Sequence, residues 1–263
     1  MTVAIGPPDC VLFDLDGTLL DTAPDLAAAI NQLRRERGAP DLPFELIRPT
    51  VSQGSPGMLK AGFGLESEEP LYAELNRRFL ELYRAAIAVE TALFPGMAEV
   101  LAYLETHAIR WGVVTNKPGW LTEPLMKALN LWSRAACVVS GDTLSKRKPD
   151  PEPLWYACER AGATPARSVY VGDAERDVRA GNQAGMITLV AGFGYLSAED
   201  RPEEWGAHGV LDRPADLLGW LDAAMAAAPE QDAGHPRGRR LFPQSMPQTG
   251  PKRSGSIRRR PGP

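Results

Sequence analysis

Short apolar runs recur along the chain and alternate with longer segments in which apolar positions repeat every three or four residues. The short runs predict buried strands at residues 10–13, 110–114, 137–139, 168–171, 187–190 and, near the end, 210–211. The longer segments predict helices at residues 97–106, 121–129, 153–161, 175–184 and 214–227. Strands that alternate with helices are typical of βαβ units. The pattern therefore predicts an α/β fold, in which a doubly wound parallel sheet has helices on both faces.

Residues 20–93 interrupt this alternation because their pattern is almost wholly helical. The helical stretches cover residues 22–37, 45–51, 56–61 and 69–89, and the run from Thr22 to Asp25 predicts a capping box that opens the first of them. Doubly wound folds bind ligands at the carboxyl ends of their strands, so an insert directly after the first strand should stand above that site. We therefore predict a catalytic core (residues 9–20 and 94–228), an α-helical cap domain (21–93) and a tail (229–263).

The predicted tail differs in composition from the rest of the chain. Its 35 residues contain seven Pro, five Gly and eight Lys or Arg but only two acidic residues, whereas the whole chain has a net charge of −4. A segment with so little apolar surface cannot offset the entropy lost on ordering, so we predict a disordered basic tail. It could bind polyanions weakly, but it has few aromatic residues for base stacking and no binding motif, so nucleic acid is not an expected partner.

Composition narrows the class of protein further. Hydrophobic residues make up 44% of the chain, which is enough for one substantial core and a smaller module. No apolar run is long enough to span a membrane, and the N-terminus lacks the features of a secretory signal. The three cysteines are far apart, which fits reduced thiols better than disulfides or a zinc site. We therefore expect a cytoplasmic protein without a membrane partner, as a monomer or a dimer.

Two carboxylates follow the first predicted strand. Asp14 and Asp16 are two residues apart, so their side chains share one side of an extended backbone, and Gly17 permits a tight backbone next to a ligand. Such a pair can divide roles, with one carboxylate attacking an electrophile and the other shuttling a proton. An ordinary surface turn explains the same residues equally well, because Asp-Gly is a common turn dipeptide.

Three other strand ends carry polar residues that suit a phosphate site. Thr115 and Asn116 offer a hydroxyl and an amide to phosphoryl oxygens, although a turn or a helix cap would use the same pair. Lys148 precedes a helix and can neutralise phosphate or carboxylate charge, or it can belong to a solvated basic loop. Asp173 and Asp177, four residues apart, offer hard oxygen ligands that suit Mg²⁺, although each could instead cap a helix.

Charge favours a metal site if these strand ends meet at one edge of the sheet. Four carboxylates would then face one lysine and an incoming phosphate dianion, and such a site repels its substrate without a divalent cation. Mg²⁺ bridging Asp14, the backbone carbonyl of Asp16, Asp173 and the phosphate would allow in-line attack by Asp14. Asp16 would then protonate the leaving alkoxide and later activate the water that hydrolyses the aspartyl phosphate.

Taken together, these segments resemble the four ordered motifs of the haloacid dehalogenase superfamily. The resemblance covers residues 9–228 and consists of Asp14-Leu15-Asp16-Gly17-Thr18, Thr115, Lys148 with Pro149-Asp150-Pro151, and Gly172-Asp173 through Asp177. It implies a nucleophile at Asp14, an acid/base at Asp16 and phosphate contacts at Thr115 and Lys148. It also implies that the metal ligands are Asp14, Asp16 and Asp173, with Asp177 as an acidic support of the metal shell. The helical insert resembles the α-helical cap of that superfamily.

Within the superfamily, the chain looks most like the phosphoglycolate phosphatase group. Residues 111–118 and 194–207 look closer still to bacterial N-acetylmuramic acid 6-phosphate phosphatases. The resemblance therefore implies a Mg²⁺-dependent phosphomonoester hydrolase that acts on a small phosphorylated metabolite. Both 2-phosphoglycolate and N-acetylmuramic acid 6-phosphate, a sugar of cell-wall recycling, fit this expectation.

The predicted cap should decide the substrate, because the four motifs contact only the phosphate. Its most polar interhelical segment contains Arg48, Ser52, Gln53, Gly54 and Ser55. We predict that this loop, through Arg48, Gln53 and Gly54 above all, faces the site and binds the organic part of the substrate. A plain interhelical turn is the alternative.

Three other functions stay open at this point. A sugar-phosphate mutase of the β-phosphoglucomutase type also uses two aspartates at this spacing, and it would release no net phosphate. A haloacid dehalogenase proper would need no Mg²⁺, but Asp16 and the pair Asp173 and Asp177 argue against it. In a non-catalytic binding protein the basic tail would act, yet all four motif positions are filled. Walker and dinucleotide motifs are absent from the sequence, so ATP or NAD is not indicated.

Overall fold

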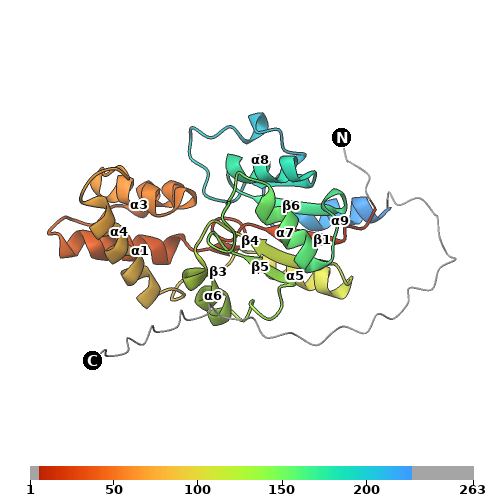
Figure 1. Ribbon diagram of the computed structural model, residues 1–263, viewed down its shortest axis with the longest axis horizontal. Coiled ribbons are helices and arrows are strands. Elements are labelled where there is room, and N and C mark those ends of the chain that lie inside the picture. The colour runs from red at the N-terminus through yellow and green to blue at the C-terminus, as the bar shows by residue number, and fades with distance from the viewer. Residues whose placement is uncertain (1–5, 227–263) are drawn as a thin grey trace, which may run out of the picture. The chain divides into compact units, whose positions relative to one another are not determined.

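A six-stranded sheet forms the centre of the fold in the computed structural model, which describes residues 6–226 (Figure 1). From one edge to the other, the strands are β5 (Cys137–Val139), β4 (Arg110–Val114), β1 (Cys10–Phe13), β6 (Ser168–Gly172), β7 (Ile187–Ala191) and β8 (Gly209–Leu211). Every neighbouring pair is parallel. The strands lie within one residue of the predicted ranges, and the predicted α/β fold with a parallel sheet is confirmed.

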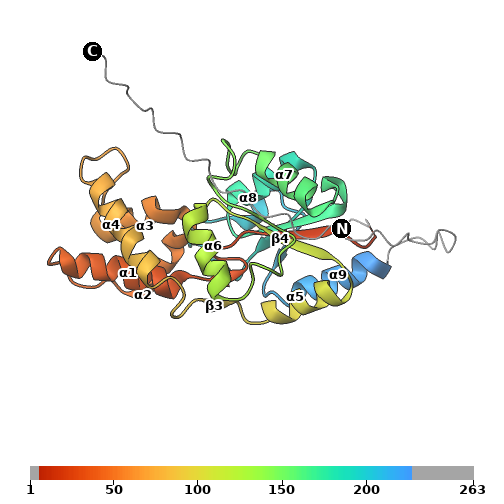
Figure 2. The same cartoon turned by 60° about the horizontal axis from the view of Figure 1, so that its bottom comes forward.

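Helices pack on both faces of this sheet (Figure 2). One hydrophobic cluster contains the buried residues of α5 (Met97–Thr106), α6 (Gly119–Ala128) and α9 (Asp216–Ala226), and a second contains those of α7 (Glu152–Ala161) and α8 (Glu175–Ala184). Side chains of β1 alternate between them, with Val11 and Phe13 in the first cluster and Cys10 and Leu12 in the second. All four are fully buried, as expected for a parallel strand covered on both sides.

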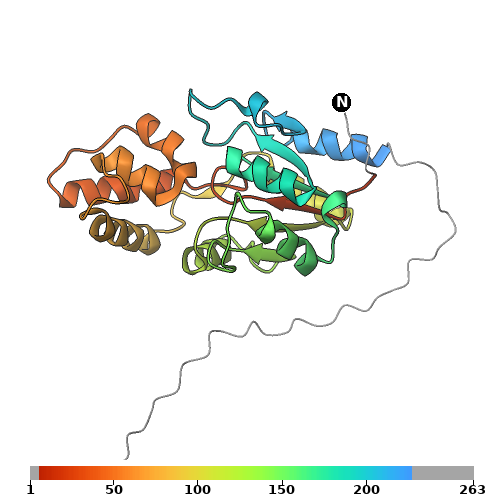
Figure 3. The ribbon, with the colours of Figure 1, turned by 45° about the horizontal axis from the view of Figure 1, so that its top comes forward.

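Residues 22–91 form what we call the helical insert, whose helices gather beside the sheet (Figure 3). It contains α1 (Ala23–Glu36), α2 (Phe44–Ile47), α3 (Gly54–Phe63) and α4 (Tyr72–Ala85), with a 3₁₀ segment at Arg48–Gln53. The short strands β2 (Leu20–Asp21) and β3 (Ala92–Leu93) flank the insert and pair antiparallel, so its entry and exit lie side by side. A helix lies in each predicted stretch, but the last one, α4, is shorter at both ends than the predicted range 69–89. That residues 21–93 act as a separate cap domain stays a prediction.

The start of α1 corrects one expectation. Thr22 is the N-cap residue of this helix, but its side chain makes no capping hydrogen bond, so the predicted capping box is wrong. The Thr22 hydroxyl instead donates to Asp16 Oδ1 at 2.6 Å. Asp25 is buried and accepts hydrogen bonds from three backbone N–H groups and one hydroxyl of residues 89–91. Both side chains therefore have partners outside the helix: Thr22 donates to Asp16, and Asp25 accepts from residues 89–91, whose donors need an acceptor.

The last described helix, α9, packs against α5. Within residues 6–226, no helix is both long and apolar enough to cross a membrane. The basic tail predicted for residues 229–263 lies outside the described residues.

Candidate active site

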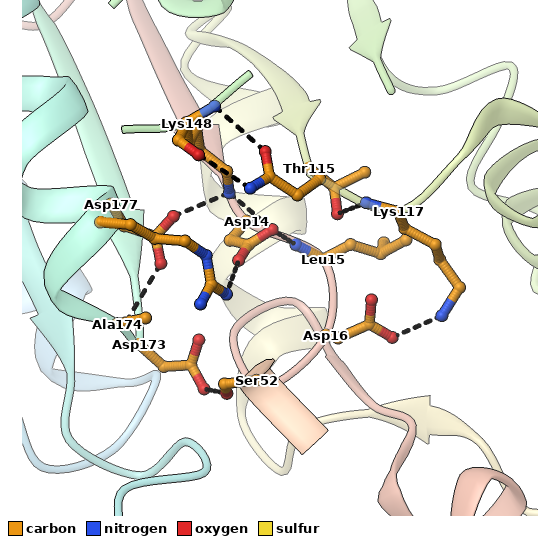
Figure 4. Close-up of polar contacts among 12 residues, drawn as sticks. Asp14, Leu15, Asp16, Ser52, Thr115, Lys117, Lys148, Asp173, Ala174 and Asp177 are labelled. Atoms are coloured by element: carbon orange, nitrogen blue, oxygen red, sulfur yellow. Dashed lines mark hydrogen bonds and ion pairs between the residues drawn. The ribbon is translucent and has the colours of Figure 1, made fainter. Parts of the chain in front are cut away.

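The polar residues selected from the sequence meet at the carboxyl ends of the central strands (Figure 4). Asp14 directly follows β1, Thr115 follows β4, and Asp173 follows β6, the strand on the other side of β1. Lys148 comes from the loop between β5 and α7. Because these strands are parallel neighbours, loops far apart in sequence open at the same edge of the sheet, where doubly wound folds place their ligands.

A buried ammonium lies between two carboxylates at the centre of this site. Lys148 Nζ is 2.9 Å from Asp14 Oδ1 and 2.7 Å from Asp177 Oδ1, and it also donates to the Val114 carbonyl and the Tyr170 hydroxyl. Lys148 and Asp177 are both fully enclosed by protein. A charge so placed needs partners on every side, and the four oxygens supply them.

The two carboxylates around Lys148 respond differently to their surroundings. Burial raises the pKa of Asp14, the Asp177 carboxylate adds to this increase, and the Lys148 ammonium opposes it. Burial acts on Asp177 in the same sense, but Lys148 and Arg176 outweigh it and hold the pKa of Asp177 below its usual value. Asp177 also accepts the Ala174 backbone N–H at 3.1 Å, so it caps α8 and pairs with Lys148 at once.

The buried carboxyl group of Asp173 is only partly paired with hydrogen-bond donors. Its Oδ2 accepts the Ser52 hydroxyl at 2.5 Å and the Tyr195 backbone N–H at 3.0 Å, whereas its buried Oδ1 has no hydrogen-bond partner among residues 6–226. Burial, with added repulsion from Asp14 and Asp177, raises the pKa of Asp173 to about 7. A buried, unpartnered carboxylate oxygen next to other carboxylates is a site that lacks positive charge.

These carboxylates fit a divalent cation. Asp14, Asp173 and Asp177 are buried and each offers a carboxylate oxygen within 4.8 Å of the others. Hard oxygen donors at such spacing suit Mg²⁺, and the unpartnered Oδ1 of Asp173 is available to it. These carboxylates therefore fit Mg²⁺, the metal that the sequence predicts.

Asp16 belongs to a separate network on the other side of Asp14. Its Oδ1 accepts the Thr22 hydroxyl at 2.6 Å and Lys117 Nζ at 2.7 Å. Lys117 also donates to the Tyr83 hydroxyl at 3.0 Å and lies over the Tyr83 ring. Burial alone would lower the pKa of Lys117, but the Asp16 carboxylate raises it above its usual value, so Lys117 keeps its charge. The sequence analysis did not select Lys117 as a site residue, although it stands directly after Thr115-Asn116.

Thr115 and Asn116 lie just after β4, as the sequence predicts, and the two residues have different hydrogen-bond partners within the protein. Both line the cavity described below. The Thr115 hydroxyl accepts the Lys117 backbone N–H. The Asn116 amide donates to the Lys148 carbonyl at 2.9 Å and accepts the Lys148 N–H at 3.1 Å, so it fixes the loop that carries this lysine. Contact of either residue with a substrate stays a prediction.

A glycine lets the loop after β1 approach the acidic cluster. Gly17 has φ +81°, and a Cβ there would lie only 2.1 Å from Asp173 Oδ2. The backbone at Gly17 is tight, as the sequence predicts, because this loop packs against Asp173; that a ligand approaches Gly17 stays a prediction. Arg176 is a further residue that sequence reasoning missed. Its Nη2 is 3.9 Å from Asp14 Oδ2, and its position before Asp177 in the fourth motif is the only sequence signal for it.

A cavity of about 540 Å³ opens beside Asp14 and Asp16 and extends to the helical insert. The insert contributes the polar segment Ser52 to Ser55 and an apolar wall made of Leu26, Val51, Met58, Phe79 and Leu80. The predicted loop residues Gln53 and Gly54 line this cavity, and their contact with substrate stays a prediction. Arg48 is not among the lining residues; its guanidinium donates to the carbonyls of Phe193 and Gly194 and lies over the Tyr195 ring. Its predicted contact with substrate stays a prediction.

Comparisons with known proteins agree with this geometry. Residues 11–191 match the model of the family described as haloacid dehalogenase-like hydrolase. The chain is 43% identical over 215 residues to an N-acetylmuramic acid 6-phosphate phosphatase of Pseudomonas putida, covering 82% of this chain and 96% of that protein. It is 41% identical over 220 residues to a phosphoglycolate phosphatase of Xanthomonas campestris pv. campestris, covering 82% and 97%.

A solved structure is similar over nearly the same region. The crystal structure of a predicted phosphoglycolate phosphatase from Haemophilus somnus has a TM-score of 0.72 and 26% identity, covering 82% of this chain and 98% of that one. The family match spans all four motifs and most of the sheet, and the relatives are matched over nearly their whole length. The chain therefore belongs to the haloacid dehalogenase-like hydrolase family.

Proposed function

We propose that this protein is a phosphatase that hydrolyses the phosphomonoester of a small metabolite through an aspartyl phosphate on Asp14. The observation that carries this proposal is the placement of Asp14 between Lys148 and the open cavity. Asp14 Oδ1 takes both close donors, the Leu15 N–H at 2.7 Å and Lys148 Nζ at 2.9 Å. Oδ2 is thereby left toward Arg176 and the cavity, as attack on phosphorus requires.

We propose Mg²⁺ as the cofactor, held by Asp14, the backbone carbonyl of Asp16 and Asp173, with Asp177 supporting the shell. The unpartnered Asp173 Oδ1 and the raised pKa of that carboxyl support this assignment. When bound, the cation supplies positive charge that offsets the carboxylates and the phosphate dianion.

The residues of the chain can then divide the reaction. Asp14 Oδ2 forms a bond to phosphorus while the bond from phosphorus to the leaving oxygen breaks, and Asp16 gives its proton to that oxygen. Asp16, now ionised, takes a proton from a water that attacks the aspartyl phosphate, which releases inorganic phosphate and restores Asp14. Lys148 balances the charge on Asp14 and phosphate, and Thr115 offers its hydroxyl to a phosphoryl oxygen.

The helical insert has the position of a cap over this reaction. Ser52 reaches Asp173 from the insert, and the segment from Ser52 to Ser55 forms part of the cavity wall. We propose that residues 21–93 form a cap domain that encloses the substrate and excludes bulk water from the aspartyl phosphate.

We also propose that the protein acts in the cytoplasm.

N-acetylmuramic acid 6-phosphate is the substrate that we favour over 2-phosphoglycolate. The volume of about 540 Å³ lies within the usual range for organic ligands and exceeds the need of a two-carbon acid. The apolar wall from the insert suits a sugar ring and an acetyl methyl group, whereas phosphoglycolate has no comparable apolar part. Two relatives at 43% and 41% identity are named for this sugar phosphate.

A mutase is less well supported by the same cavity. A mutase that passes through a bisphosphate needs cations for a second phosphate at the organic end of its site. All four cationic residues that line the cavity lie outside the helical insert, three in loops and one at the start of α8: Lys117, Arg147, Lys148 and Arg176. The lining residues of the helical insert include no cation. This distribution favours a substrate with one phosphate, and hence hydrolysis.

Phosphate release from a panel of substrates tests this proposal. The panel contains N-acetylmuramic acid 6-phosphate, 2-phosphoglycolate and glucose 6-phosphate, each with Mg²⁺ and with EDTA. We expect the highest kcat/KM for N-acetylmuramic acid 6-phosphate and loss of activity in EDTA. A higher kcat/KM for 2-phosphoglycolate would reject the substrate assignment, and isomerisation of a sugar phosphate without phosphate release would reject hydrolysis.

A further inference from the structure

A second buried lysine lies in the site, and neither phosphate binding nor the acidic cluster accounts for it. The Lys117 side chain is only 7% exposed, and its Nζ contacts Asp16 Oδ1 at 2.7 Å and the Tyr83 hydroxyl at 3.0 Å. Lys148 holds Asp14 and Asp177, so the two lysines serve different carboxylates. A buried ammonium is costly unless its surroundings satisfy it, which makes this contact set specific.

The contacts of Lys117 distinguish the two oxygens of Asp16. Oδ1 accepts both the Thr22 hydroxyl and Lys117 Nζ. No hydrogen bond within residues 6–226 reaches Oδ2, and only the other oxygen is joined to Lys117 by a dashed line in Figure 4. Because Asp16 is also among the residues that line the cavity, Oδ2 is the oxygen that can carry a proton to and from the reacting groups.

We propose that Lys117 is a positioning residue for Asp16, and that it fixes the carboxylate so that Oδ2 faces the leaving oxygen of the substrate. This inference rests on the proposed role of Asp16 as acid and base. Lys117 contacts Asp16 through Oδ1 and thereby fixes the orientation of Oδ2, the oxygen that carries the proton. Its effect is therefore on the geometry of proton transfer, and phosphate binding is left to Lys148 and Thr115.

The helical insert takes part in this arrangement through Tyr83. Tyr83 belongs to α4 and is buried, and it offers Lys117 both its hydroxyl oxygen and its ring face, at 4.5 Å from Nζ to the ring centroid. Asp16, Lys117 and Tyr83 thus join the loop after β1, the loop after β4 and a helix of the insert. Asp16 is consequently aligned for proton transfer when the insert stands over the site.

The dependence of activity on the leaving group tests this role. An alkyl leaving group needs a proton, whereas p-nitrophenolate leaves readily without one, so misplacing the acid should affect only the first. We expect Lys117→Met to lower kcat/KM for N-acetylmuramic acid 6-phosphate by about 10- to 100-fold, less than the full contribution of general acid catalysis of about 100- to 10,000-fold, because Asp16 is misplaced but still present. Its kcat/KM for p-nitrophenyl phosphate should fall by less than about threefold, because kcat/KM reports only the steps up to leaving-group departure.

Matched variants separate positioning from damage to the fold. Lys127→Met removes a surface lysine that pairs with Glu123 and should leave both kcat/KM values unchanged. Tyr83→Phe keeps the ring but removes the hydroxyl, so it should show the same leaving-group dependence as Lys117→Met to a smaller degree. If Lys117→Met does not fold, Lys117→Gln and Tyr83→Phe carry the test.

A double-mutant cycle gives the sharpest outcome. When Asp16→Asn has removed the acid, the added Lys117→Met change should cause no further loss with the alkyl substrate. Equal losses of kcat/KM for both substrates, or full additivity of the two changes, would overturn the positioning role. If the wild-type protein hydrolyses the substrates and Asp16→Asn shows the leaving-group dependence while Lys117→Met does not, only this inference fails. If the wild-type protein releases no phosphate, the proposed function itself fails.

Discussion

Each carboxylate of the site has a different set of donors, and that set decides what it can do. Asp14 and Asp16 both line the cavity and use Oδ1 for their close donors, whereas Asp177 is enclosed by Lys148 and the start of α8. Asp173 alone has a buried oxygen without a partner among the described residues. In the function that we propose, identical side chains take the roles of nucleophile, acid/base and metal ligands because their neighbours differ.

The pKa of Asp173 predicts how pH and Mg²⁺ act on stability. In metal-free protein this pKa is about 7, above the ordinary carboxyl value, so the folded state binds a proton more tightly than the unfolded state. The free energy of unfolding should therefore fall as pH rises from about 4 to about 7. Mg²⁺ needs the ionised carboxylate, so it should raise the Tm more at about pH 8 than at about pH 5.

Thermal unfolding with EDTA and with Mg²⁺ measures this effect, and Asp173→Asn is the control. The variant keeps the shape of the side chain but has no charge to titrate. The difference in Tm between wild type and variant should reverse with pH in EDTA, with the variant more stable at the higher pH. An equal response to Mg²⁺ in both proteins would rule out Asp173 as a ligand.

Gly17 offers a second test at this scale. Alanine there would be strained by the positive φ and would place its Cβ against Asp173 Oδ2. Gly38 has a similar φ of +71°, but nothing lies within 4 Å of a Cβ built there, so Gly38→Ala should cost only backbone strain of about 1 to 2 kcal/mol. Gly17→Ala should destabilise the protein more and lower kcat/KM by about 100-fold through misplaced carboxylates. Equal effects of the two variants in urea unfolding and kinetics would contradict this account.

At the scale of the elements, one carboxylate joins the two ends of the helical insert. Asp25 in the first turn of α1 accepts the hydrogen bonds of residues 89–91, which lie just before β3. β2 and β3 pair at the same place, so the chain enters and leaves the insert at one junction. The position of Ser52, Gln53 and Tyr83 over the site depends on this junction.

Removal of the Asp25 carboxylate should therefore destabilise the junction. Asp25→Ala leaves several buried donors without an acceptor, and we expect a loss of about 2 to 4 kcal/mol in the free energy of unfolding measured in urea. Asp25→Asn keeps one acceptor oxygen and should lose less. Asp41→Ala removes an exposed partner of Arg35 and should change stability little. A loss from Asp25→Ala no larger than that from Asp41→Ala would contradict the structural role of this carboxylate.

The strands and the outer helices could be predicted because their patterns are local. Continuous apolar runs such as residues 10–13 and 110–114 fit strands that are buried on both faces, and the structure has them at those positions. The capping box at Thr22 failed for the opposite reason. Its residues form a correct local motif, but Asp16 and residues 89–91 compete for the same side chains through contacts that no local pattern contains.

At the scale of the whole molecule, the site was predictable wherever it depends on strand ends. Asp14, Thr115 and Asp173 each follow a predicted strand directly, Lys148 lies in the loop after another, and a parallel sheet brings such positions together. Lys117 and Arg176 were not selected because their partners come from other parts of the chain, such as Tyr83 in α4. Which side chains the insert places over the cavity depends on its packing, and sequence periodicity does not contain that information.

The central claim is that Asp14 carries the phosphoryl group during turnover, and trapping that intermediate tests it most directly. Asp16→Asn keeps Asp14 but lacks the group that activates water, so with p-nitrophenyl phosphate and Mg²⁺ it should accumulate the aspartyl phosphate. After an acid quench, tandem mass spectrometry should find one phosphoryl group, on Asp14. A phosphoryl group on another residue, or release of p-nitrophenolate by wild type and Asp16→Asn without any phosphorylated chain, would contradict the account.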